Sequence, residues 1–371
     1  MGERRVVHFI DCLAAAAGGP SRTVPSLCRA LSNLSEYWNV SIVVARREPD
    51  QASPPGNGTA IEPPVYVTDS WNAVLTDPAA RPHLLHDHGQ WLPINHASAV
   101  AARRNRLPRI VSPRGMLSPW ARRHRRWKKY LAWRIYARRD LRQANLLHAT
   151  SVLEADELRA LGVKQPIAVI PNGVDPAPPL PSNHAPPERP YVLFMSRLHR
   201  KKGVAELLDV WRELNPSNWD LVLAGPDEER LLAGAPLPRN ARYVGSVDGR
   251  IKQQLLADAR VFVLPSYSEN FGVVVAESLM AGVPVITTHG TPWSSLTDEG
   301  CGWWIPMAKE RLRDALSQAM SMPAEELQAM GSLGRQFAIR EFSWDQIGRQ
   351  MSEVYQWVLG GGDPPACVCT K

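Results

Sequence analysis

The chain has 371 residues, of which 44% are hydrophobic and 21% charged, and its formal net charge is +7. This composition is typical of a soluble globular protein with two or three domains, and it excludes a disordered chain, a collagen, a coiled coil and, because the apolar runs are short, a membrane-spanning helix. Five cysteines without a C-x-x-C pair exclude a disulfide scaffold and favour a reducing compartment.

Short β-branched runs alternate with longer amphipathic stretches in the first half of the chain. The predicted strands are Val6–Ile10, Val40–Ala45, His83–His86, Arg109–Val111, Leu146–Ala149 and Ile167–Ile170. The predicted helices between them are Thr23–Leu34, Asn95–Asn105, Trp120–Gln143 and Val152–Leu161. This alternation predicts a parallel sheet covered by helices.

A proline-rich stretch then interrupts the pattern, because seven of the fifteen residues from 176 to 190 are proline. Such a stretch fits neither a strand nor a helix interior and predicts a stiff linker. A second alternating series follows. Its predicted strands are Tyr191–Met195, Leu221–Ala224, Val261–Leu264 and Val285–Thr287. Its predicted helices are Val204–Leu214, Arg250–Ala259, Val273–Ala281 and Glu310–Met320, and a last helix covers Asp345–Leu359.

The predicted fold class is therefore α/β, with two doubly wound Rossmann-like domains facing a central cleft. We expect an N-terminal domain at residues 1–175, a linker at 176–190 and a C-terminal domain at 191–343. Residues 344–360 are expected to form a helix that crosses back to the first domain, and residues 361–371 a loose tail.

A loop with two glutamates follows the predicted strand Val261–Leu264 and leads into a helix. Glu269 and Glu277 stand eight residues apart in it. The backbone groups at the helix start belong to Phe271, Gly272, Val273 and Val274. Unpaired N–H groups at a helix start bind anions, above all phosphate, and a glycine lets a ligand approach closely. We expect Glu277 to reach ribose hydroxyls and Glu269 a sugar; a turn with one capping acid is the alternative.

Two other strand ends carry cations. In the turn Ser196–Gly203, Arg197 can bind phosphate through two N–H groups and Lys202 adds a point charge. Arg114 ends the fourth predicted strand, where it can bind an anionic acceptor or the phosphate of a donor. Solvated basic turns are the alternative at both places.

The remaining strand ends of the first half carry glycines and histidines. Gly18 and Gly19 separate the first strand from the first helix and allow a ligand to touch the backbone, although no G-x-G-x-x-G pattern is present. His86 and His88 form an H-x-H pattern at the end of the third strand. This pattern fits a metal site with His96 as the third ligand, a histidine that hydrogen-bonds a substrate hydroxyl, or a strand-end cap.

The positive charge is concentrated in residues 103–142, which hold fifteen Arg or Lys and one acid, so that the rest of the chain sums to −7. Concentrated charge indicates one anionic partner, a membrane or a phosphate-bearing ligand, and no nucleic acid. Trp127, Leu131 and Ile135 share one face of the predicted helix Trp120–Gln143, which favours contact with an anionic bilayer. A partly buried helix with a solvated basic face is the alternative. The expected membrane-contact residues are Arg122, Arg123, Arg126, Trp127, Lys128, Lys129 and Trp133.

Taken together, these motifs resemble glycosyltransferase family 4, the retaining nucleotide-sugar transferases of GT-B fold. The resemblance covers nearly the whole chain in order: the early glycine pair, the H-x-H pattern, Pro171–Asp175, S-R-L-x-x-K-K-G, and E-x7-E continuing into Ala281–Ile286. The runs Ser112–Trp120 and Thr291–Trp293 further resemble bacterial surface-polysaccharide members. Ser196 stands where a glycine is usual in the family.

The resemblance implies an acceptor-binding first domain, with Arg114 on the acceptor, and a second domain that binds the nucleotide sugar. The implied catalytic residues are His88, Arg197, Lys202 and Glu269. The implied donor-binding residues are Gly18, Gly19, Arg197, Lys202, Phe271, Gly272, Val273, Val274 and Glu277. Because the cations and helix N–H groups neutralise the departing diphosphate, no metal or other cofactor is required beyond the UDP-sugar or GDP-sugar donor.

The resulting hypothesis is a hexosyltransferase of exopolysaccharide, capsule or O-antigen biosynthesis that extends a glycan on a polyprenyl diphosphate. We expect it in the cytoplasm, peripheral on the anionic inner membrane, because His8 and Asp11 interrupt the only stretch that resembles a signal peptide. A nucleotide-sugar epimerase of similar fold is one alternative. A non-catalytic basic protein that binds membrane or nucleic acid is the other.

Overall fold

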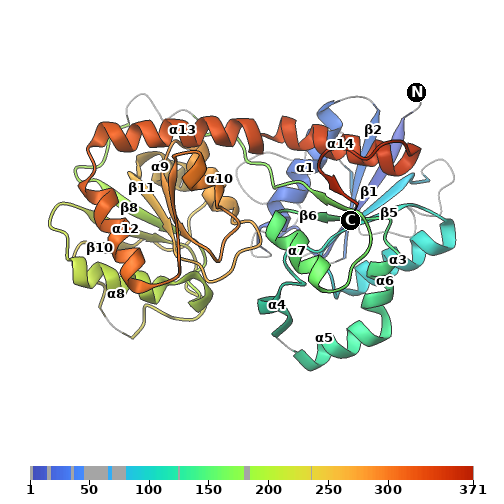
Figure 1. Cartoon of the computed structure of the whole chain (residues 1–371), viewed down its shortest axis with the longest axis horizontal. Coiled ribbons are helices and arrows are strands. Elements are labelled where there is room, and N and C mark those ends of the chain that lie inside the picture. The colour runs from blue at the N-terminus through green and yellow to red at the C-terminus, as the bar shows by residue number, and fades with distance from the viewer. Residues whose placement is uncertain are drawn as a thin grey trace. The chain divides into compact units, whose positions relative to one another are not determined.

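The computed structural model describes residues 3–14, 18–34, 37–45, 66–68 (backbone only), 81–123, 126–178, 184–234 and 236–370. The chain divides into two compact units, residues 1–173 together with 344–371, and residues 174–343 (Figure 1). Residues 179–183 of the predicted linker lie outside the described residues, and the rest of that linker belongs to the second unit.

The first unit contains a sheet with the strand order β14-β7-β6-β5-β4-β1-β2-β3, in which β14 is antiparallel to β7 and the other pairs are parallel. The strands are β1 (Arg4–Ile10), β2 (Trp38–Val44), β3 (Tyr66–Thr68), β4 (Leu84–His88), β5 (Arg109–Ser112), β6 (Leu146–Ala149), β7 (Ile167–Val169) and β14 (Val368–Cys369). β4, β5 and β6 are buried along their whole length, as expected for parallel strands covered on both faces.

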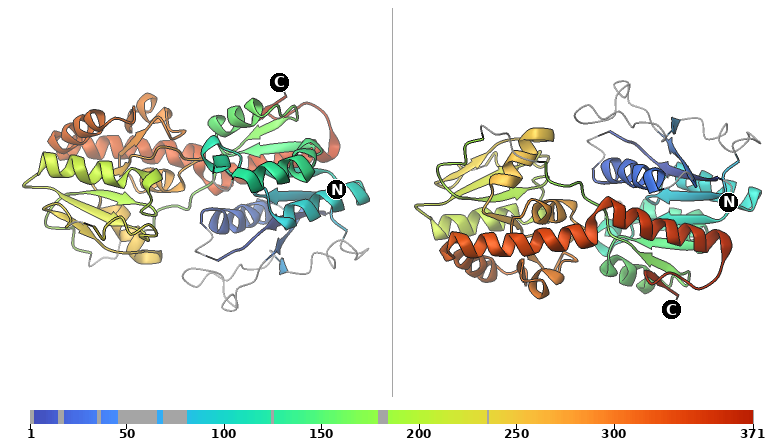
Figure 2. Two further views of the ribbon diagram at one scale, coloured as in Figure 1. Left: turned by 90° about the horizontal axis from the view of Figure 1, so that it is seen from below. Right: turned by 90° about the horizontal axis from the view of Figure 1, so that it is seen from above.

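Helices cover this sheet, and Figure 2 shows them on both of its faces. They include α1 (Pro20–Leu34), α3 (Pro93–Asn105), α7 (Val152–Ala160) and α14 (Trp344–Gly360). α14 packs against α1, and a Cβ built on Gly348 would already lie 3.2 Å from Ala30. The indole of Trp38 donates a hydrogen bond to Ser352 at 2.7 Å. The last long helix therefore belongs to the core of the first unit.

The prediction of one helix over Trp120–Gln143 is wrong. The described residues form α4 (Pro119–Arg123), α5 (Arg126–Ala132), a π-helix (Trp133–Ala137) and α6 (Arg138–Arg142). The ammonium of Lys129 donates to the carbonyl of Ala121 at 2.5 Å, although a straight helix rising 1.5 Å per residue would separate the α-carbons of these residues by about 12 Å, too far for the lysine side chain. α5 therefore turns back on α4.

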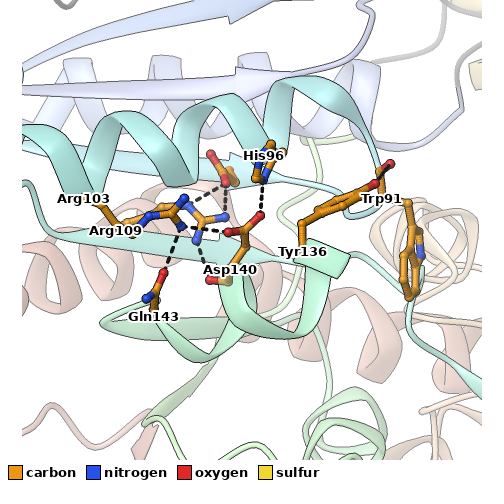
Figure 3. Close-up of polar contacts among 8 residues, drawn as sticks. Trp91, His96, Arg103, Arg109, Tyr136, Asp140 and Gln143 are labelled. Carbon is orange, nitrogen blue, oxygen red and sulfur yellow. Dashed lines mark hydrogen bonds and ion pairs between the residues drawn. The ribbon is translucent and has the colours of Figure 1, made fainter. Parts of the chain in front are cut away.

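Polar contacts fix the end of this segment to the rest of the unit (Figure 3). The carboxylate of Asp140 accepts from Arg103 at 2.8 Å and contacts His96 at 2.6 Å, and the hydroxyl of Tyr136 donates to the carbonyl of Trp91 at 2.9 Å. The π-helix adds one residue to a turn between Trp133 and these anchors. His96 is thus an anchor for α6.

The prediction of a loose tail at residues 361–371 is also wrong. β14 extends the sheet beside β7, and Val368 is 9% exposed. The N–H of Val169 donates to the carbonyl of Cys367 at 2.8 Å, and Arg159 donates to the carbonyl of Cys369 at 3.0 Å. The tail is ordered because it covers backbone groups that β7 would otherwise expose at the sheet edge.

The second unit contains a parallel sheet with the strand order β10-β9-β8-β11-β12-β13. The strands are β8 (Tyr191–Met195), β9 (Asp220–Ala224), β10 (Ala241–Tyr243), β11 (Val261–Leu264), β12 (Val285–Thr288) and β13 (Gly302–Ile305). The helices are α8 (Val204–Leu214), α9 (Gly249–Asp258), α10 (Val273–Met280), α11 (Ser295–Asp298), α12 (Lys309–Ser321) and α13 (Ala324–Phe342). Strand order reverses between β8 and β11, which is the position where doubly wound sheets bind ligands.

The predicted α/β fold class with two parallel, doubly wound sheets is confirmed. Both sheets reverse their strand order next to their first strand, β1 in one unit and β8 in the other. Among the described helices, none is both long enough and apolar enough to cross a bilayer.

Candidate functional site

In the second unit, the loops after β8 and β11 come together at the reversal point of the sheet. The N–H of Tyr267 donates to the carbonyl of Lys201 at 2.9 Å, and the hydroxyl oxygen of Ser266 lies 3.1 Å from the same carbonyl. A Cβ at Gly203, which has φ +68°, would overlap the carbonyl of Pro265. Glycine at this position therefore permits the close approach of the two loops.

An ion pair joins these loops. The ammonium of Lys202 contacts the carboxylate of Glu269, and the hydroxyl of Ser266 donates to the same carboxylate oxygen at 3.0 Å. The two side chains are only 14% and 11% exposed. Burial alone would raise the pKa of Glu269, but the charge and hydrogen bond of Lys202 outweigh it and hold that pKa below its usual value. The site thus holds a fixed cation beside a fixed carboxylate.

The backbone after Glu269 is also held in place. Gly272 has φ +78°, and α10 begins there without a side-chain cap, so its first N–H groups point out of the helix without an intrahelical partner. The indole of Trp293 donates to the carbonyl of Phe271 at 2.5 Å, and the two rings lie 5.1 Å apart. The N–H of Glu269 donates to the carbonyl of Gly290 at 2.8 Å. The segment after β12 therefore orients this helix start.

The other two predicted side chains of this unit, Arg197 and Glu277, pair with residues other than Lys202 and Glu269. Arg197 is 59% exposed and lies 3.7 Å from the carboxylate of Glu228. Glu277 on α10 pairs with Lys252 of α9 at 2.5 Å. Within the described residues, neither side chain makes an ion pair or hydrogen bond with Lys202 or Glu269.

In the first unit, the structure brings the predicted residues Arg114, His88 and Gly19 into one polar cluster. The guanidinium of Arg114 donates to His88 at 3.1 Å, to Asn172 at 2.8 Å and to Thr23 at 3.3 Å. The hydroxyl of Thr23 donates to the carbonyl of Gly19 at 3.2 Å, and the neighbouring Gly18 has φ +92°. These residues lie at the carboxyl ends of the strands, next to the reversal point between β1 and β4.

Arg114 is a cation with neutral partners. Its three acceptors, His88, Thr23 and Asn172, carry no charge, and in the described residues no carboxylate forms an ion pair with it. Burial lowers the pKa of Arg114 to about 10. The nearby carboxylate of Glu154 accepts instead from the N–H groups of Gly115 at 2.6 Å and Thr150 at 2.8 Å. A guanidinium whose hydrogen-bond acceptors are all neutral can bind an anion.

The metal interpretation of the H-x-H pattern fails for His96, because its ring contacts Asp140 (Figure 3). His8 on β1 takes its place in space: the ligand atoms of His8, His86 and His88 all lie within 4.8 Å of one another. Sequence reasoning missed His8, because a single histidine in an apolar strand carries no signal. It also missed Tyr355 on α14, whose hydroxyl contacts His86 at 2.6 Å.

The large apolar and basic side chains of α4, α5 and the π-helix divide into an exposed group and a group that faces the protein. Trp127, Tyr130, Leu131 and Ile135 are 68%, 63%, 51% and 67% exposed. Trp133 instead lies 5.9 Å from the ring of Trp91, and Lys129 also lies over that ring, so two of the seven expected membrane-contact residues face the protein. A cavity of about 400 Å³ between them is lined by Trp91, Pro119, Arg122, Arg123, Arg126, Lys129, Tyr130 and Trp133.

Two family models match most of the chain. Residues 18–173 match the family model "Glycosyl transferase 4-like domain", and residues 180–337 match "Glycosyl transferases group 1". Alpha-maltose-1-phosphate synthase of Mycobacterium tuberculosis is 26% identical over 330 residues, covering 78% of this chain and 83% of that protein.

Solved structures show the same fold. Sucrose-phosphate synthase of Thermosynechococcus elongatus superposes with a TM-score of 0.73 at 20% identity, covering 97% of this chain and 100% of that one. Anabaena HepE in complex with UDP-glucose superposes with a TM-score of 0.71 at 18% identity, covering 95% and 99%.

Proposed function

The chain belongs to glycosyltransferase family 4, with the GT-B fold and hexosyltransferase activity of that family, and from this premise we propose that it transfers the sugar with retention to a lipid-linked glycan. The observation that carries the proposal is the Lys202–Glu269 pair at the reversal point of the second sheet, beside the uncapped start of α10. This arrangement offers a cation and backbone N–H groups to a diphosphate and a carboxylate to a sugar.

The proposed chemistry is the departure of a nucleoside diphosphate. Negative charge develops on the β-phosphate as the glycosidic bond breaks, and Lys202, Arg197 and the N–H groups of α10 stabilise it. Glu269 holds the sugar and Glu277 the ribose. The acceptor hydroxyl attacks from the face that the diphosphate leaves, and the departing phosphate takes its proton. The reaction then requires neither a protein nucleophile nor a metal.

Arg114 is the proposed acceptor-binding residue of the first unit, and His88 accepts a hydrogen bond from its guanidinium. A guanidinium whose hydrogen-bond acceptors are all neutral suits a phosphate group on the acceptor, as in a glycan carried on a polyprenyl diphosphate. Such an acceptor belongs to exopolysaccharide, capsule or O-antigen biosynthesis, the pathways that we propose for this enzyme.

The exposed side chains of α5 support the proposed location on the cytoplasmic face of an anionic inner membrane. Trp127 and Tyr130 are amphipathic aromatic residues of the kind that lie at bilayer interfaces, and the arginines of α4 and α5 add attraction to anionic lipids. Lys128 lies 5.3 Å from the ring of Trp127, so charge and apolar surface occur together.

A thermal-shift titration with UDP-sugars and GDP-sugars tests the proposed donor site. A bound donor stabilises the folded protein by about 2.7 kcal/mol when its concentration is one hundred times Kd. We expect a rise in Tm with one of the two nucleotide classes, and no rise in Lys202→Ala. A rise of equal size in Lys202→Ala would contradict the assignment of the donor site.

Sedimentation with lipid vesicles tests the membrane proposal. We expect binding to vesicles with 30% phosphatidylglycerol, and about tenfold weaker binding for Trp127→Ala/Ile135→Ala. Leu333→Ala/Ile339→Ala is the matched control, because these two side chains are 47% and 50% exposed on α13. Equal binding of both double variants would overturn the proposal.

A further inference from the structure

A continuous chain of hydrogen bonds runs through the first unit from the guanidinium of Arg114 to the carbonyl of Ile170. It passes through side chains of β1, β4, β5, β6 and α14 that are all buried. The successive heavy-atom distances are Arg114 to His88 3.1 Å, His88 to His8 2.8 Å, His8 to Tyr355 3.4 Å, Tyr355 to His86 2.6 Å, His86 to Ser112 2.7 Å, Ser112 to His148 2.7 Å and His148 to Ile170 2.8 Å. We call it the histidine chain.

The two ends of the histidine chain fix the direction of every hydrogen bond in it. A guanidinium only donates and a carbonyl only accepts. Nδ1 of His88 must therefore accept from Arg114, which leaves the proton of a neutral ring on Nε2. The same step repeats along the chain until Nε2 of His148 donates to the carbonyl of Ile170. All four histidines are thereby neutral, with the proton on Nε2.

Burial favours this single protonation pattern. It lowers the pKa of His8 and of His148 to about 3, with the charge of Arg114 acting in the same direction, and lowers the pKa values of His86 and His88 well below normal. A second proton on any of these rings would place two donors face to face. Because each Nδ1 already accepts a hydrogen bond, no ring in this pattern has a lone pair left for a metal.

The histidine chain therefore orients Arg114 without neutralising it. The other partners of Arg114, Thr23 and Asn172, are neutral as well, and Glu154 is occupied by two backbone N–H groups. Nη2 of Arg114 makes no hydrogen bond to any residue that the structure describes. A positive charge is thus kept in one orientation with one nitrogen left for a ligand.

We propose that Tyr355, His86, Ser112, His148 and His8 are positioning residues that hold Arg114 for a phosphate group of the acceptor. The acceptor in this statement rests on the proposed function. Two other parts of the proposal, the binding of an oxyanion by Arg114 and the tautomers of the four rings, do not rest on the proposed function. They are therefore measured separately from sugar transfer.

Nitrogen-15 NMR of histidine-labelled protein tests the direction of the chain. We expect four neutral rings with the proton on Nε2, unchanged between pH 8 and pH 5, and no one-to-one binding of Co²⁺ to them. A ring among the four that is charged at pH 6, a proton on Nδ1, or stoichiometric Co²⁺ binding that broadens these signals would overturn the proposal.

Binding of inorganic pyrophosphate, followed at the side-chain signals of Arg114 and His88, tests the positioning role. Tyr355→Phe removes the hydroxyl that joins His8 to His86, and we expect the Kd to rise about tenfold. Ser352→Ala, on the same helix, removes the bond to Trp38 outside the chain and should change Kd less than twofold.

Ser112→Ala interrupts the histidine chain at β5 and should raise the Kd for pyrophosphate as much as Tyr355→Phe does. The second variant allows the test to be made if the first does not fold. Wild-type pyrophosphate affinity in either folded variant would overturn the positioning role. A nucleotide-sugar titration without any thermal shift, alongside the expected pyrophosphate result, would count against the proposed transferase site alone.

Discussion

Replacing Lys202 by alanine leaves the carboxylate of Glu269 without its cation in a site where that side chain is 11% exposed. Removing one partner costs about 3–5 kcal/mol in a fully buried ion pair and about 0–1 kcal/mol in an exposed pair. The Lys202–Glu269 pair lies between these limits, so we expect Lys202→Ala to lower the free energy of unfolding by about 2 kcal/mol. Glu269→Gln in the same chain removes the orphaned charge and should restore part of that loss.

The effect on catalysis should be larger than the effect on stability. The loss of one preorganised donor to a developing negative charge lowers kcat by about a hundredfold to a thousandfold. Arg200→Ala is the matched control, because Arg200 lies in the same turn, is 76% exposed and pairs with Glu229 at 3.1 Å. We expect this control to change kcat less than twofold.

The assay measures release of nucleoside diphosphate from the donor that raises Tm most, together with urea unfolding of each variant. Both readouts are needed. The urea unfolding shows at which temperatures a destabilised variant is folded, and its activity is compared with wild type only at those temperatures. Lys202→Ala with more than a third of wild-type kcat/KM would refute the role given to this residue, as would an equal loss in Arg200→Ala.

Two further predictions concern stability. The pKa values of His8 and His148 are about 3, below the value of about 6.5 in an unfolded chain, so the unfolded chain binds more protons as the pH falls. The free energy of unfolding should therefore fall by about 1.4 kcal/mol per histidine per pH unit from pH 6 to pH 4 and stay constant above pH 7.5. Urea midpoints that do not change from pH 8 to pH 4 would contradict this prediction. Gly331→Ala should lower the free energy of unfolding by about 1–3 kcal/mol, because the new Cβ overlaps the carbonyl of Gly282. Gly234→Ala is the control and should leave the free energy of unfolding unchanged, because no atom lies within 4 Å of its new Cβ. Equal urea midpoints for the two variants would disprove the argument.

The sequence predicted well the strands that consist of at least four consecutive apolar residues, such as Tyr-Val-Leu-Phe-Met in β8 and Val-Phe-Val-Leu in β11. β8, β11 and α8 begin and end at the predicted residues. β10 and β13 were missed, because they are the outer strands of the second sheet and contain Ala-Arg-Tyr and Gly-Trp-Trp-Ile, which form no run of this kind. α13 was missed because Gly331 and Gly334 lower helix propensity, although Gly331 is what allows contact with Gly282 of the second unit.

The wrong helix Trp120–Gln143 shows a limit of periodicity. The apolar spacing of Trp127, Leu131 and Ile135 did identify three exposed side chains. It gave no sign that Lys129 reaches back to Ala121, because that contact depends on how α4 and α5 fold on each other.

The site residues were predictable one at a time and their contacts were not. Lys202 and Glu269 were chosen from separate strand ends, and only the strand order of the sheet brings them together. The histidine chain could not be predicted from the sequence. His8 and His148 are single polar residues in apolar strands, and Tyr355 comes from a helix more than 200 residues after His148.

A crystal structure of the protein with UDP or GDP, whichever raises Tm, tests the donor site most directly. The diphosphate is predicted to contact the ammonium of Lys202 and the N–H groups of Val273 and Val274 at the start of α10. A diphosphate bound elsewhere in the second unit, with the Lys202–Glu269 pair intact and solvated, would contradict the account.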